Sequence, residues 1–247
     1  MQTRETDRYR AIPASSVRVS GETNEIVFLG DERCPTCELK RASSGKVCNK
    51  SVPKQTFQFG NPGPLGLCAF AITTFISSMI TAQVLNLQNP RIVIGPACFY
   101  GGAAQFIAGI WEFFLGNTFG LLVMTLYGSF WLSYAAIFID AFGIAAAYEG
   151  DEDQYHTGIA FFSLAWLLFS LMLLILTLKS TAAVVALFVS INLTLILLTV
   201  GSFLRSTGVS RASGISGMIS SAIALYNAWT GLATPQNSYW AVTPKHN

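Results

Sequence analysis

The chain has 247 residues, of which 52% are hydrophobic and 11% are charged, and its net charge at pH 7 is only +2. Ten of its 15 lysines and arginines precede Gly60, and the sequence that follows is mostly apolar. This composition is that of an integral membrane protein and not of a water-soluble one, and we expect no nucleic-acid partner.

Residues 1–57 form a polar segment that mixes Ser, Thr, Arg and Glu with little periodicity. Such a segment is typical of a mobile arm, and we expect a cytoplasmic N-terminal tail. Within it, the apolar sequence EIVFLG at 25–30 predicts a short strand or helix. Early charges such as Arg4 and Glu5, without an early apolar core, argue against a signal peptide.

Three cysteines lie in this tail: Cys34 and Cys37 in the sequence CPTC, and Cys48. The spacing resembles part of a zinc site, but a structural zinc site needs four ligands, and no nearby His or further Cys supplies the fourth. We interpret these residues as reduced thiols and expect no bound metal or cofactor.

The sequence GNPGPLGL at 60–67 marks the boundary between the tail and the apolar region. Proline lacks the amide hydrogen that a helix interior needs but that the first turn does not. Pro62 and Pro64 therefore predict the start of a helix. Asn61 is placed to cap its unpaired amides or to offer its own amide to an anion.

Six apolar stretches follow, each long enough to cross about 30 Å of hydrocarbon as a helix of about 20 residues. Strand-like alternation is absent, so an α-helical bundle must satisfy the backbone hydrogen bonds in the lipid bilayer. We expect an all-α integral membrane protein with a six-helix domain at 58–234 and a C-terminal tail at 235–247. The predicted helices span about residues 64–85, 93–114, 119–147, 157–178, 181–204 and 213–233.

An even number of crossings places both termini on one side of the bilayer. That side carries most of the Lys and Arg residues, including the lysines just before the first helix, whereas the opposite side carries only Arg91, Arg205 and Arg211. The positive-inside rule therefore predicts that both termini are cytoplasmic. The acidic sequence YEGDEDQYH at 148–156 is expected as a loop on the other side.

Polar side chains inside the predicted helices are costly in lipid and need partners. In the second helix, Gly101, Gln105, Ala108 and Glu112 share one face at helical spacing. Small residues there let helices pack closely, whereas Gln105 and Glu112 suit a polar pathway and a structural hydrogen bond equally well. The third helix carries an aromatic stripe of Tyr127, Trp131, Tyr134 and Phe138.

Residues with enzyme-like chemistry are scarce. The sequence has no metalloprotease motif, no Gly-rich phosphate loop after a strand and no Cys–His pair in an apolar segment. His156 is expected in a loop, and His246 is the last residue but one. We therefore do not expect an enzyme.

Several consecutive motifs resemble one known family: GNPGPLGL followed by AFAITTF, then YGGAAQFIAGIWEFFLGNTFG, then YGSFWLSYA. Together they resemble the acetate uptake transporter family, which includes bacterial succinate-acetate permeases and fungal acetate transporters, some linked to ammonia export, over about residues 58–234. Gly63 replaces the usual alanine of the family signature NPAPLG, a change expected to loosen this segment slightly. The signature corresponds to Asn61, Pro62, Gly63, Pro64, Leu65 and Gly66.

The resemblance implies a six-helix protomer within a hexamer at the plasma membrane, each protomer with its own narrow path for small monocarboxylates. It also implies a hydrophobic constriction formed by Phe70, Tyr127 and Ile191, where bacterial relatives have leucine at the last position. Further polar residues are expected either to line the path or to hold the helices together: Tyr100, Gln105, Glu112, Asn117 and Thr118.

The function expected from these observations is transport of acetate and similar small monocarboxylates, coupled to protons. In this interpretation the start of the first helix attracts the carboxylate, and the constriction admits only a small acyl group. Export of ammonia or ammonium is an alternative, with which the acidic loop is compatible. A non-transporting membrane sensor that signals through its tail is a third.

Overall fold

The computed structural model describes residues 17–20, 26–29, 32–35 and 59–240. The chain divides into two compact units, Met1–Gln58 and Phe59–Asn247, and each is described by itself. In the first, an antiparallel sheet has the order β1 (Val17–Ser20), β2 (Ile26–Leu29), β3 (Glu32–Pro35).

Strand β2 confirms the strand alternative for EIVFLG, whereas β1 and β3 were not predicted. Cys34 lies in β3 and pairs with Val27 in the register of the sheet. Cys37 and Cys48 lie outside the described residues. The mobility expected for the tail stays a prediction.

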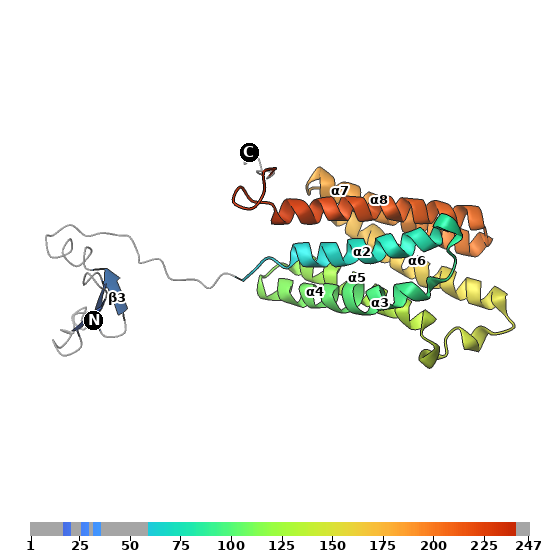
Figure 1. Cartoon of the computed structure of the whole chain (residues 1–247), viewed down its shortest axis with the longest axis horizontal. Coiled ribbons are helices and arrows are strands. Elements are labelled where there is room, and N and C mark those ends of the chain that lie inside the picture. Colours follow the sequence, from blue (N-terminus) through green and yellow to red (C-terminus); the bar gives the residue numbers. More distant parts are fainter. Residues whose placement is uncertain (1–16, 21–25, 30–31, 36–58, 241–247) are drawn as a thin grey trace, which may run out of the picture. The chain divides into compact units, whose positions relative to one another are not determined.

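The second unit is a bundle of long helices that lie side by side (Figure 1). Helix α8 packs against both α2 and α7, α6 packs against α7, and α4 packs against α5. The all-α fold predicted for the membrane domain is therefore confirmed. Its long segments are α2 (Gly63–Thr81), a broken helix over Pro90–Phe114, α5 (Thr118–Phe138), α6 (Glu152–Thr177), α7 (Ala182–Leu204) and α8 (Thr207–Leu232).

Five of these segments, all except α8, are long and apolar enough to span a membrane by length and composition, within the described part of the chain. Helix α8 has 26 residues, but its many serines and glycines make it less apolar. Those small residues face its neighbours: Gly214 and Gly217 are buried, and the Ser221 hydroxyl donates to the Ala71 carbonyl of α2 at 2.7 Å. Because α2 and α7 cover this face, α8 completes a six-helix domain.

The second long segment is built from four pieces: η3 (Pro90–Val93), α3 (Ile94–Cys98), the π-helical η4 (Phe99–Ala104) and α4 (Gln105–Phe114). Pro96 cannot donate a backbone hydrogen bond to the turn before it, which weakens the regular helix in this segment. Its carbonyl accepts from the Phe99 amide and also from the Thr73 hydroxyl of α2, the latter at 3.4 Å. A Cβ atom at Gly101 would lie 2.6 Å from the Thr73 hydroxyl oxygen, so glycine is needed where the broken helix meets α2.

The third predicted helix, 119–147, is too long: α5 ends at Phe138, because Ile139 is extended and the chain then turns. Short helices η5 (Asp140–Phe142) and η6 (Ala146–Tyr148) follow, with Gly143 between them at φ +65°. The apolar sequence therefore continues past the helix end. Another short helix, η2 (Val84–Asn86), lies in the turn after α2.

Helix α6 begins earlier than expected, at Glu152, because the Asp151 side chain caps it by accepting from the Gln154 amide at 3.0 Å. Much of the predicted acidic loop, including His156, is thus helical. Helix α8 also begins earlier than predicted, after a Ser206 cap whose hydroxyl accepts from the Val209 amide at 3.4 Å.

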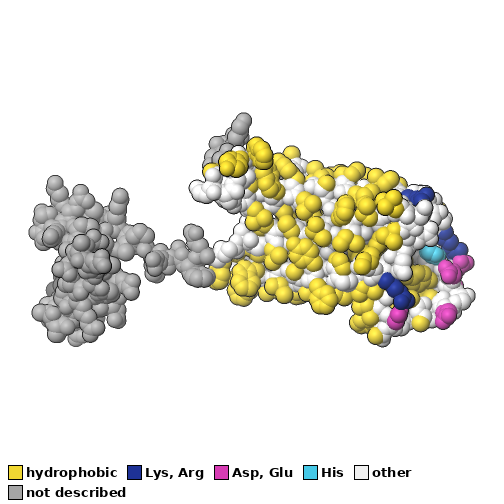
Figure 2. Space-filling model, viewed as in Figure 1, with side chains coloured by type: hydrophobic (Ala, Val, Ile, Leu, Met, Phe, Trp, Pro, Cys, Tyr) yellow, Lys and Arg dark blue, Asp and Glu magenta, His cyan; other side chains and the backbone are white. Residues whose placement is uncertain are grey.

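Apolar side chains cover the flank of the second unit, and charged ones gather at one end (Figure 2). Exposed apolar residues on α6 such as Leu168 and Ile175 suit contact with lipid. At the charged end, Arg91 pairs with Asp140 at 3.2 Å, and Arg205 of α7 pairs with Asp153 of α6. This pattern is that of an integral membrane domain with one strongly charged surface.

Candidate functional site

The threshold segment, residues 61–66, forms the start of α2 as predicted. Helix α2 begins at Gly63, and the Asn61 side-chain oxygen accepts a hydrogen bond from the Gly63 amide at 3.0 Å. Pro62 and Pro64 are buried, while Asn61 and Leu65 are exposed. Gly66 packs against the Met124 side chain of α5, where a Cβ atom would overlap its sulfur.

Glu112, near the end of α4, is the acidic residue among the predicted site residues, and it lies close to the threshold segment. It is 5% exposed, and its Oε2 accepts a hydrogen bond from the side-chain nitrogen Nδ2 of Asn117 at 2.8 Å. Asn117 in turn caps α5, which begins at Thr118, by accepting from the Gly120 amide at 3.0 Å. A Cβ atom at Gly63 would lie 3.5 Å from Glu112 Oε1, so this carboxylate lies beside the positive end of the α2 dipole.

Replacing Asn61 tests the role of the threshold. We expect Asn61→Asp to lower acetate uptake more than Asn61→Ala does, although Asp keeps the capping acceptor, because its negative charge next to Glu112 repels a carboxylate. Uptake of labelled acetate by cells with equal surface expression of each variant is the measurement. Equal uptake by both variants and the wild type would exclude the threshold from anion attraction.

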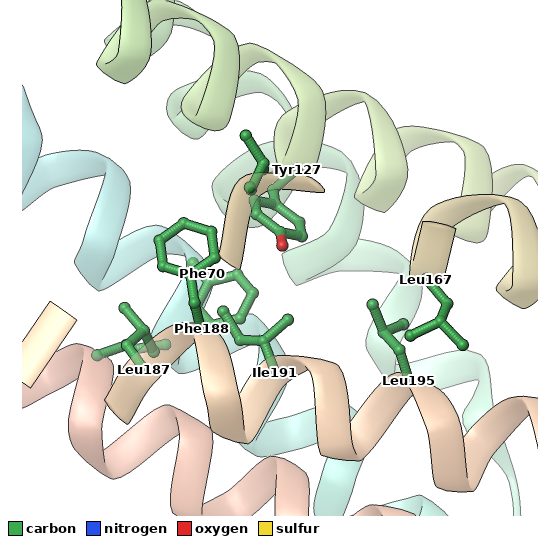
Figure 3. Packing of buried hydrophobic residues seen from close by; sticks show 10 residues of the cluster. Phe70, Tyr127, Leu167, Leu187, Phe188, Ile191 and Leu195 are labelled. Atoms are coloured by element: carbon green, nitrogen blue, oxygen red, sulfur yellow. The ribbon is translucent and has the colours of Figure 1, made fainter. Parts of the chain in front are cut away.

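The three predicted constriction residues come from three helices and meet in one buried cluster. Phe70, Tyr127 and Ile191 are each 7% exposed or less, and the rings of Phe70 and Tyr127 are 5.6 Å apart between centroids. Figure 3 shows them grouped with Leu187 and Phe188 in the interior of the bundle. Residues distant in sequence thus form an apolar ring across α2, α5 and α7.

A cavity of about 80 Å³ begins at this ring and extends along α2 away from the threshold. Such a volume is several times what one water molecule requires. Its wall is mostly apolar, although several Ser and Thr residues contribute to it. One of them, Thr194, donates its hydroxyl to Ser216 Oγ at 2.9 Å. The lining includes the three constriction residues and, farther along, Thr74, Ser78, Trp131, Thr194, Ser213 and Ser220.

Two residues of this lining each have a buried polar atom without a hydrogen-bond partner among the described residues: Thr74 Oγ1 and Trp131 Nε1. Buried polar groups normally have partners, so an unpartnered pair at one cavity suggests that something else satisfies them. No role was predicted for Thr74, and Trp131 was predicted only as part of an aromatic stripe. The spacing of hydroxyls in ITTFISSMIT was the available signal for this face of α2.

A second cavity, of about 390 Å³, lies at the charged end and shares Thr81, Phe130, Tyr134 and Leu198 with the first. Its lining includes His156 and Arg205. The two cavities therefore adjoin, and together with the apolar ring and the threshold they follow the length of α2. Sequence reasoning missed this cavity because its residues come from loops and helix ends far apart in the chain.

Two predicted polar residues lie away from this line. Tyr100 is half-buried in η4, and Gln105 is 1% exposed at the start of α4; neither lines either cavity. The side-chain oxygen Oε1 of Gln105 has no hydrogen-bond partner among the described residues. Both the polar pathway and the structural hydrogen bond therefore stay predictions for these two residues.

These features define a helical integral membrane protein whose buried interior holds an apolar ring with a cavity beside it. The family model described as the GPR1/FUN34/yaaH family matches residues 44–246. The chain belongs to this family.

Similar proteins include ammonia transport outward protein 2 of Saccharomyces cerevisiae, 42% identical over 92% of this chain and 81% of that protein. Acetate permease A of Emericella nidulans is 37% identical over 76% of this chain and 67% of that protein. Among solved structures, that of the bacterial acetate channel SatP superposes with a TM-score of 0.64 at 30% identity, covering 71% of this chain and 93% of the channel.

Proposed function

We propose that this protein transports acetate and similar small monocarboxylates across the plasma membrane, through a path in each protomer of a hexamer. The path follows α2 from the threshold, past the apolar ring of Phe70, Tyr127 and Ile191, into the cavity beyond it. The similarity to acetate permease A and to the acetate channel SatP supports the substrate class. The distribution of Lys and Arg supports an orientation with both termini in the cytoplasm.

The observation that carries this proposal is Trp131, a residue of the cavity lining whose indole N–H has no hydrogen-bond partner among the described residues. An indole N–H is a donor only, so it needs an acceptor. A carboxylate oxygen provides a strong, charged one. Neutral ammonia can also accept a hydrogen bond but has no charge to strengthen it, whereas an ammonium ion has no lone pair to offer. The Thr74 hydroxyl, also without a partner among the described residues, supplies a second donor for a carboxylate.

The apolar ring supports coupling of transport to protons. A carboxylate loses its hydration between Phe70, Tyr127 and Ile191, whereas neutral acetic acid passes at far lower cost. Acetate therefore crosses this ring together with a proton, and we assign Glu112 beside the threshold as the group that exchanges that proton. Its carboxylate is already held by Asn117, so it is oriented toward the start of α2.

Removing the indole donor tests the substrate assignment. We expect Trp131→Phe to raise the acetate concentration for half-maximal uptake by about tenfold or more, because a hydrogen bond to a charged group is worth about 1.5–3 kcal/mol. Uptake of labelled acetate into liposomes with purified variants is the measurement, and Tyr226→Phe, an exposed position on α8, is the control. An unchanged half-maximal concentration in a folded Trp131→Phe protein would refute the assignment.

Ammonia or ammonium export is the second candidate, favoured by the likeness to ammonia transport outward protein 2. The aromatic lining of the cavity, which includes Phe130, Tyr134 and Trp166, is compatible with a small cation. Competition separates the two functions in the same liposomes. Lactate competes with acetate at a shared carboxylate site, whereas ammonium competes only if the cavity accepts a cation.

A further inference from the structure

The hydroxyl of Tyr127 has one hydrogen-bond partner among the described residues, Ser170 of α6, at 2.8 Å between Oη and Oγ. Ser170 is completely buried. Other buried hydroxyls of these helices, such as those of Thr177 and Ser190, donate to a carbonyl of their own helix at 2.8 Å. Ser170 instead uses its hydroxyl to hold a side chain of the neighbouring helix α5.

The backbone of Ser170 contacts the part of the apolar ring that α7 contributes. Asn192 Nδ2 donates to the Ser170 carbonyl at 3.2 Å and to the Phe188 carbonyl of its own helix at 2.8 Å. Asn192 directly follows Ile191 in α7 and is 3% exposed. Ser170 therefore links the ring of Tyr127, through its hydroxyl, to the helix that carries Ile191, through its carbonyl.

We propose that Ser170, together with Asn192, is a positioning pair that sets the gap between Tyr127 and Ile191 and so the largest acyl group that passes. This inference rests on the proposed function and adds a determinant of its selectivity. Removal of the Ser170 hydroxyl leaves the Tyr127 hydroxyl without its one hydrogen-bond partner among the described residues. The Tyr127 ring then tilts toward the vacated space on α6 and away from Phe70, which widens the gap.

The test compares the uptake of lactate with that of acetate by liposomes that hold the full-length wild type, Ser170→Ala, Tyr127→Phe or the double variant. We expect each single variant to raise the lactate-to-acetate ratio by about threefold or more, and the double variant to raise it no further, because both changes remove the same hydrogen bond. Thr177→Val is the matched control: it removes a buried hydroxyl of α6 that bonds only within its own helix.

Separate outcomes judge the two proposals. If the wild type transports acetate but Ser170→Ala leaves the ratio unchanged, or if the two single effects add in the double variant, the positioning role is overturned while acetate transport stands. A ratio changed equally by Thr177→Val would also overturn it, since the effect would then be one of general packing. If the wild type takes up no acetate, the proposed function fails. The methylammonium-to-ammonium uptake ratio of the same proteins is then judged by the same criteria. If the wild type transports none of these solutes, both proposals are overturned.

Discussion

Phe70→Ala is expected to admit lactate, raising its uptake relative to acetate by about tenfold or more. The Phe70 ring lies 5.6 Å from that of Tyr127 and forms one wall of the apolar ring at the start of the cavity. Removing it opens space for a larger acyl group, and even one methylene changes pocket discrimination by about 1–3 kcal/mol. Uptake of labelled lactate and acetate by the same liposomes measures the change.

Loss of a buried aromatic ring also costs about 3–5 kcal/mol of stability, so the folded fraction of the variant must be measured alongside uptake. Phe75→Ala is the matched control, because Phe75 lies on the same helix but is 44% exposed on its outer side. Its lactate-to-acetate ratio should equal that of the wild type. A folded Phe70→Ala protein that carries acetate yet stays closed to lactate would remove Phe70 from the constriction.

Gly214→Ala is expected to destabilise the bundle strongly, although alanine favours a helix over glycine by about 1 kcal/mol. A Cβ atom at residue 214 would lie 2.7 Å from the Ser78 carbonyl oxygen and would overlap the Ala82 backbone nitrogen at the end of α2. Because both neighbours are backbone atoms, α8 must move away from α2 to make room. The thermal unfolding midpoint of the purified protein measures the effect.

Gly208→Ala, on the same helix, is expected to have no effect on the thermal unfolding midpoint or to raise it. At residue 208, the nearest atom to a Cβ is Ser206 Oγ at 3.9 Å, which is ordinary contact distance. Its midpoint should stay the same or rise, whereas that of Gly214→Ala should fall by several degrees. Similar midpoints for the two variants would show that α8 does not approach α2 as closely as described.

Local chemistry made part of this fold predictable. Pro62 and Pro64 lack amide hydrogens and so marked the start of α2. The end of α5 was not predictable, because apolar residues continue through 139–147 while the backbone turns at Ile139 and Gly143. Hydrophobicity records contact with an apolar environment, which helices, turns and interfacial segments share, so it does not locate a helix end.

The candidate site, too, was predictable only in part. The Phe70, Tyr127 and Ile191 cluster was inferred from family resemblance, since no local pattern links three helices. The cavity at Thr74 and Trp131 was missed for that reason: each residue looks like ordinary helix content, and only the packing leaves both polar atoms without a partner among the described residues. Long-range packing, which periodicity does not encode, creates the site.

The most direct test of the central claim is uptake of labelled acetate by liposomes that hold the purified protein, with and without an inward proton gradient. Lactate and ammonium are added as competitors, and empty liposomes are the control. We expect acetate to accumulate when the gradient is present, with inhibition by excess lactate and none by ammonium. Equilibration without accumulation would contradict proton coupling alone, whereas acetate uptake no greater than that of empty liposomes would contradict acetate transport itself.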